Sequence, residues 1–202
     1  MDNYLSFLDA AKILKEVKAK KVKNLKLLTS VNTKQLELYL QAYARTEFID
    51  LKIETIPFGT LRQHIINDID SNTDSLLLLT PADFSPKLDW RTGFSEKTIP
   101  IEEIRNEIKE FGCLVAKYKF ESLFLLPTSL PQLFQKSQDL LSVELLIRNI
   151  ANDLGAFILK DIYFSLDSYL ISGCPVAGKD LSLMANDITK NIFQDKVEKR
   201  RL

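Results

Sequence analysis

The sequence predicts an α/β fold, a three-layer sandwich with a mostly parallel five-stranded sheet, preceded by an N-terminal helix. Short apolar runs alternate about five times with segments of helical periodicity, which is typical of parallel strands joined by crossover helices. The run 75–79 is almost uniformly apolar, as expected for a strand that is buried on both faces. The chain has 202 residues, enough to bury a core without disulfides or a metal.

In the first half of the chain, helical and strand-like patterns follow one another. Residues 3–20 have apolar side chains at helical spacing with lysines on the other face, which predicts an amphipathic helix. A short apolar run predicts a strand at 24–30, and helical spacing resumes over 33–46. Alternation of apolar and polar residues predicts a second strand at 51–57, because successive side chains of a strand point to opposite faces. A short helix is expected at 61–69.

The second half continues this alternation from the buried strand at 75–80. Residues 81–98 contain two prolines and a glycine and are expected to form a loop. A helix opened by Pro100 follows and extends to residue 117. The remaining elements are expected in the order of a strand at 122–127, a helix at 138–154 ended by Gly155, a strand at 156–160 and a helix at 179–198.

Composition and charge argue against several classes of function. Lysine plus arginine and aspartate plus glutamate number 27 each, so no net charge attracts nucleic acid or an anionic membrane. The lysine-rich run 18–23 is compatible with nucleic-acid binding, but a solvated helix end is the favoured interpretation, because cations suit that end of a helix. No membrane span and no signal sequence are recognised, and the two scattered cysteines suit a reducing compartment, so a cytoplasmic protein is expected.

Metal and cofactor motifs do not occur in the sequence. The single histidine and the two cysteines, without a CxxC pair, predict no zinc site. Neither GxGxxG nor GxxxxGK[ST] is found, so no dinucleotide or P-loop nucleotide is expected, and no cofactor is predicted. We divide the chain into an N-terminal helical segment (1–23), an α/β domain (24–195) and a basic linker or end segment (196–202).

Ligands of open α/β sheets bind at the carboxyl ends of the strands. In this chain those ends lead to four segments, 29–32, 57–60, 80–83 and, before the last helix, 172–178. The four segments resemble the blocks of SGNH hydrolases, also called GDSL-like esterases. In that resemblance Ser30 corresponds to the nucleophile of Gly-Asp-Ser, and Gly59 to the glycine of the second block. Ala82 replaces the oxyanion asparagine of Gly-x-Asn-Asp, Cys174 replaces the histidine of Asp-x-x-His, and Ile171 replaces its aspartate.

A closer resemblance covers nearly the whole chain. Residues 27–32, 57–59 and Asp89-Trp90-Arg91 are similar to the N-terminal SGNH-like domain of FkbH-like proteins. In that family a haloacid-dehalogenase-like (HAD) domain follows, opening with Asp-x-Asp-x-Thr. Members are associated with loading a three-carbon acyl unit onto a carrier protein, or with surface polysaccharide loci. No Asp-x-Asp-x-Thr occurs in these 202 residues, so the chain is either part of a longer protein or a standalone relative.

The resemblance to a hydrolase lacks the groups that would activate a nucleophile. A serine needs a base within hydrogen-bond reach, and the base needs an orienting group. His64 is not at the position of the family's histidine. It is either a displaced base for Ser30 or, the favoured interpretation, a helix histidine with a local partner. The loss of one oxyanion donor alone typically costs about 10²–10³ in turnover.

Other residues are candidates for binding rather than for catalysis. We expect a pocket for an acyl or hydroxy-acid ligand, with a floor formed by Ser30, Asn32, Gly59 and Ala82. The positive charge for an acidic ligand would come from Arg62 or Arg91. Trp90 is either an exposed anchor for a partner or a plug that fills the pocket. Cys174 is either a nucleophile or, more in keeping with free cysteines, a small buried side chain. Asp83 and Asp89 alone are too few for a metal site, although Asp83 remains a binding candidate.

Two hypotheses of function follow. The first is a non-catalytic recognition module beside a HAD-like domain, which holds an acyl-carrier protein, an acyl group or a partner in secondary-metabolite or surface-polysaccharide biosynthesis. The second is a divergent SGNH acyl hydrolase or acyltransferase that uses Ser30. The missing asparagine and Asp-x-x-His favour the first hypothesis.

Overall fold

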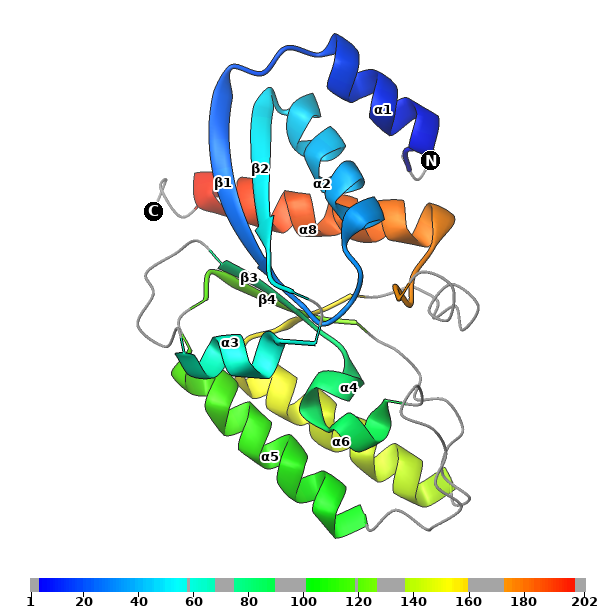
Figure 1. Ribbon diagram of the computed structural model, residues 1–202, viewed down its shortest axis with the longest axis vertical. Helices are drawn as coiled ribbons and strands as arrows, with labels where there is room; N and C mark the ends of the chain where they lie inside the picture. Colours follow the sequence, from blue (N-terminus) through cyan, green and yellow to red (C-terminus); the bar gives the residue numbers. More distant parts are fainter. Residues whose placement is uncertain are drawn as a thin grey trace. The chain divides into compact units, whose positions relative to one another are not determined.

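The computed structural model describes residues 4–57, 59–67, 75–89, 101–118, 120–126, 137–159 and 173–198. These residues fall into two compact units (Figure 1). The first unit is built from three stretches of the chain. These are the residues up to Leu27, the residues Val31–Thr55, and the residues from Leu159 onward. The second unit consists of Leu28–Ser30 and Ile56–Ile158.

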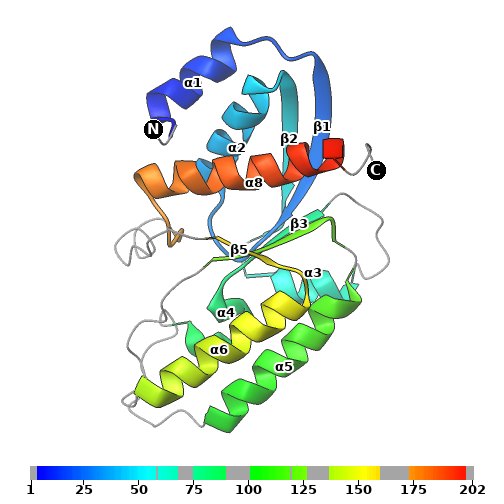
Figure 2. The same ribbon diagram turned by 180° about the vertical axis from the view of Figure 1, so that it is seen from behind.

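The first unit combines parallel strands with helices. Its described elements are α1 (Phe7–Glu16), β1 (Lys21–Leu28, with Leu28 counted in the second unit), α2 (Lys34–Thr46), β2 (Ile49–Thr55) and α8 (Gly178–Glu198). β1 and β2 are parallel, in a register that runs from Lys21↔Ile49 to Leu27↔Thr55. Helix α2 connects the two strands and packs against β2, α1 and α8, as Figure 2 shows from behind.

The strand pair of the first unit has one covered face. Leu25, Leu27 and Leu51 are buried on that face, and α8 lies on the same side, because the Lys23 ammonium is 4.8 Å from the ring centroid of Phe193. Side chains of a strand alternate between its faces, so Val22 and Asn24 point the other way, and both are exposed.

The N-terminal helix is held at its first turn. Ser6 caps it, because the Ser6 hydroxyl accepts a hydrogen bond from the Asp9 N–H and the Asp9 carboxylate accepts one from the Ser6 N–H. Just before the cap, the Leu5 N–H donates to the hydroxyls of Tyr43 (3.2 Å) and Ser182 (2.9 Å). Tyr43 and Ser182 are themselves 2.9 Å apart and buried, so α1 is attached to both α2 and α8.

The second unit contains the buried strands. Its described elements are α3 (Leu61–Asn67), β3 (Ser75–Leu79), α4 (Pro81–Phe84), the 3₁₀ helix η1 (Pro86–Leu88), α5 (Ile101–Lys117), β4 (Ser122–Leu125), α6 (Ser137–Asp153) and β5 (Phe157–Ile158). The pairs β3–β4 and β4–β5 are parallel. Leu28, at the end of β1, joins the buried cluster of this unit, and the strand order is β2-β1-β3-β4-β5. The predicted α/β fold with a parallel five-stranded sheet and an N-terminal helix is confirmed.

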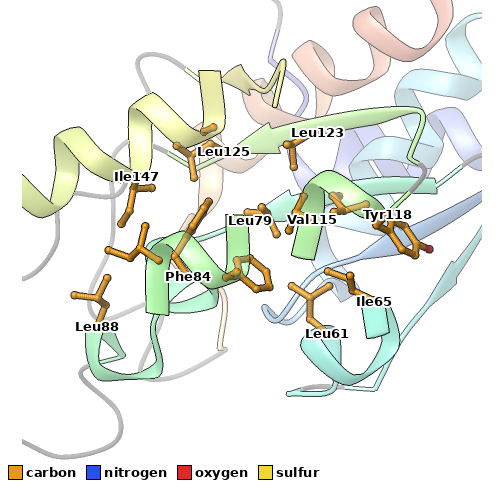
Figure 3. Packing of buried hydrophobic residues seen from close by; sticks show 14 of the residues in the cluster. Leu61, Ile65, Leu79, Phe84, Leu88, Val115, Tyr118, Leu123, Leu125 and Ile147 are labelled. Carbon is orange, nitrogen blue, oxygen red and sulfur yellow. The ribbon is translucent and has the colours of Figure 1, made fainter. Parts of the chain in front are cut away.

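The core of the second unit lies between its strands and α3, α4, α5 and α6. Figure 3 shows Leu79, Leu123 and Leu125 of the strands facing Phe84 and Ile147. Every residue of β3 is buried, as its apolar sequence predicted. Helices α5 and α6 approach closely at Gly112, where an added Cβ would lie 2.6 Å from Ile150 Cγ2. Only glycine therefore fits this crossing without a shift of the Ile150 side chain.

Two predicted element boundaries are wrong. The helix expected over 3–20 ends at Glu16, and the lysine-rich run is not a helix end, because β1 begins at Lys21. The N–H groups of Lys20 and Lys21 donate to the Phe48 carbonyl (2.7 and 3.2 Å), so these residues extend beside β2. The first part of the loop expected at 81–98 contains α4 and η1 instead. Pro81 suits the first position of a helix, and the Asp83 carboxylate caps it.

Candidate functional site

Ser30 lies two residues beyond the end of β1 and belongs to the second unit. The preceding Thr29 is buried, and its hydroxyl donates to the Leu78 carbonyl at 2.7 Å, which ties this end of β1 to β3. Ser30 itself is half-buried. Among the described residues, no hydrogen bond joins the Ser30 hydroxyl to His64 or to another side chain. A serine hydroxyl without a base is a weak nucleophile.

His64, the sequence-predicted displaced base, lies on α3. Its N–H donates to the Thr60 carbonyl at 2.8 Å, as the first turn of α3 requires. The side chain is half-buried, and its Nε2 atom is shielded from solvent. The histidine thus lies on α3 with its ring partly covered by neighbouring residues, and its role stays a prediction.

Gly59 and Thr60 form the turn that leads into α3. The Thr60 hydroxyl donates to the Pro57 carbonyl at 2.6 Å, and the Thr60 N–H donates to the same oxygen at 3.2 Å. Gly59 has φ of +78°, in the left-handed region that favours glycine. A Cβ at Gly59 would have no atom within 4 Å, so the backbone conformation, rather than a close neighbour within the chain, calls for glycine here.

Ala82 and Asp83 lie on α4, at the carboxyl end of β3. The Thr80 N–H and hydroxyl both donate to Asp83 Oδ2, at 2.6 and 2.8 Å. This oxygen therefore stabilises the first turn of α4. The sequence Thr-Pro-x-Asp resembles a capping box, in which the fourth residue bonds back to the first. Ala82, half-buried beside it, has only a methyl group as its side chain.

Arg62 points from α3 toward α4 and α5. Its guanidinium carbon is 5.1 Å from the centroid of the Phe111 ring, and Nη2 donates to the Phe84 carbonyl at 3.5 Å. The charge of Arg62 also helps to lower the pKa of Glu107 on α5. The cation predicted to bind a ligand is therefore already in contact with an aromatic ring and near a carboxylate.

An ionic network that the sequence did not suggest joins η1 to α5. Lys87 Nζ is 2.5 Å from Glu107 Oε1 and 2.9 Å from Glu103 Oε2, and the hydroxyl of the buried Ser85 donates to Glu107. Burial acts to raise the pKa of Glu107, but the hydrogen bonds from Lys87 and Ser85 outweigh it and hold the pKa below its ordinary value. The signal in the sequence was the i, i+4 spacing of the two glutamates on a predicted helix.

The remaining candidates of the described chain lie in the first unit. The Asn32 N–H donates to the Gly173 carbonyl at 3.0 Å, which places Asn32 beside the segment of Cys174. Asn32 is exposed, and its Oδ1 accepts from the Lys34 N–H at 3.2 Å, at the start of α2. Cys174 is only 5% exposed. Burial raises the pKa of its thiol, although a backbone hydrogen bond involving Val176 opposes the shift.

Several predictions lie beyond what the structure tests. Trp90, Arg91 and Ile171 are outside the described residues. The predicted grouping of Asn32 with Ser30, Gly59 and Ala82 stays a prediction, because Asn32 belongs to the first unit and the other three to the second. Within the described ranges, no helix is both long and apolar enough to span a bilayer, and no cluster of three His, Cys, Asp or Glu side chains could hold a metal.

Comparisons with known proteins inform the fold. No family model and no curated protein matches the chain. A solved structure of the N-terminal part of BF1531 from Bacteroides fragilis, described as containing a phosphatase domain complexed with Mg, overlaps 93% of this chain with a TM-score of 0.68 and 12% identity. The chain corresponds to 56% of the length of that structure.

Esterase structures overlap the chain less well. Axe2, an acetylxylan esterase from Geobacillus stearothermophilus, matches 86% of this chain and 94% of its own, with 11% identity and a TM-score of 0.44. LAE5, an α/β hydrolase enzyme from the metagenome of Lake Arreo, matches 85% and 94%, with 14% identity and a TM-score of 0.46. With TM-scores below 0.5, these likenesses carry no argument about activity. The chain thus has a parallel α/β fold that it shares with the N-terminal part of BF1531.

Proposed function

We propose that this chain is a degenerate SGNH-like domain of an FkbH-like protein, that it does not catalyse acyl hydrolysis, and that it binds an acyl-carrier protein, an acyl group or a partner in secondary-metabolite or surface-polysaccharide biosynthesis. The observation that supports the absence of acyl hydrolysis is the burial of Cys174. The cysteine stands where an SGNH hydrolase has its histidine, it is 5% exposed, and burial raises the pKa of its thiol. A buried neutral thiol cannot take the proton of a serine as a histidine does.

The other half of the catalytic set is equally unsuited to the reaction. Ala82 offers a methyl group in place of an oxyanion donor, and Asp83 Oδ2 is engaged by Thr80. An enzyme that lacks both the base and an oxyanion donor retains little of its rate enhancement. The hydroxyl of Ser30 and the turn at Gly59 remain as neutral donors suited to a bound carbonyl group.

The link to an FkbH-like protein is supported by the comparison with BF1531. The overlapping structure contains a phosphatase domain and is longer than this chain, which spans 56% of it. An SGNH-like domain beside a HAD-type phosphatase domain is the arrangement that the resemblance to FkbH-like proteins implies. Arg62, Trp90 and Arg91 are the residues that we assign to contacts with an acidic ligand or a partner.

A titration by calorimetry with a purified acyl-carrier protein tests this function. We expect the holo form, with or without a loaded acyl group, to bind wild type and Ser30→Ala equally, since Ser30 is not used as a nucleophile. Release of the acyl group from the loaded carrier protein should be no faster with wild type than with Ser30→Ala. Faster release that depends on Ser30 would instead establish the divergent hydrolase, and an absence of binding to any carrier form would remove the carrier protein as partner.

A further inference from the structure

We draw no further inference here: the strongest candidate, the exposed apolar face that Tyr4, Phe7 and Leu8 form at the start of α1, carries none, because the exposed charges along that helix are of both signs and nothing in the described part of the chain shows what covers the face.

Discussion

The N–H of Asn32 donates a hydrogen bond to the carbonyl oxygen of Gly173 at 3.0 Å. This bond joins the residues just beyond β1 to the segment just before α8, which carries Cys174. Gly173 has φ of +71°, and a Cβ there would lie 3.5 Å from the Cβ of Asn32. Within the first unit, two of the four blocks singled out in the sequence are therefore neighbours.

Replacement of Gly173 tests this junction. Gly173→Ala should lower the free energy of unfolding by about 1–2 kcal/mol, because an alanine in the left-handed conformation is strained. Gly173→Asn is the matched control, since asparagine adopts this conformation more readily, and it should lose clearly less. Urea unfolding followed by circular dichroism measures both. Equal stability of the alanine and asparagine variants would show that the conformation at Gly173 does not determine the effect.

The ionic network between η1 and α5 predicts a pH dependence. Glu107→Gln keeps the contact with Ser85 but removes the charge that faces Lys87, and should cost about 1 kcal/mol at neutral pH, because the pair is partly exposed. The pKa of Glu107 is lowered in the folded state. Its contribution is therefore present above the ordinary range of a glutamate pKa and is lost as the pH falls through the lowered pKa.

Urea unfolding of wild type and Glu107→Gln across acidic pH checks this sign. The stability difference between the two proteins should shrink toward zero as the pH falls. Glu110→Gln, an exposed glutamate on the same helix, should differ little from wild type at any of these pH values. A difference that grew with acidity would contradict the assignment.

Ser30 should fail to react with a fluorophosphonate probe at neutral pH. In the described structure its hydroxyl has no hydrogen bond to a base, and an unactivated serine reacts slowly. Gel fluorescence after incubation with the probe, with an active serine hydrolase as a positive control, measures the labelling. Stoichiometric labelling that disappears in Ser30→Ala would establish the hydrolase alternative.

The two cysteines should differ in their reactivity. Cys113 on α5 is exposed, whereas Cys174 is buried, and burial raises the pKa of the Cys174 thiol, which reduces its thiolate fraction. Brief treatment with iodoacetamide at neutral pH should therefore modify Cys113 well before Cys174, as measured by mass spectrometry of peptides. In urea both should react at the same rate. Faster modification of Cys174 in the folded protein would restore it as a candidate nucleophile.

The fold could be predicted because its signals are local. The apolar run of β3 and the alternation in β2 reflect burial on two faces and on one face, and neighbouring residues are enough to reveal either pattern. The basis of the proposed lack of catalysis is equally local, since the single histidine and the identity of residue 82 as alanine are read directly from the sequence.

Other features depend on residues far apart in the chain, and only the tertiary structure decided them. β1 starts at Lys21 because the N–H groups of Lys20 and Lys21 donate hydrogen bonds to the Phe48 carbonyl. The periodicity of the sequence does not reveal this partner. The burial of Cys174 and the bond from Asn32 to Gly173 depend on how the chain before α8 returns to the end of β1. The left-handed backbone of Phe48 could not be predicted either, because a phenylalanine disfavours it and only the surrounding structure holds it there. Local sequence patterns determined the elements, whereas long-range packing decided the contacts and the exposure of the side chains.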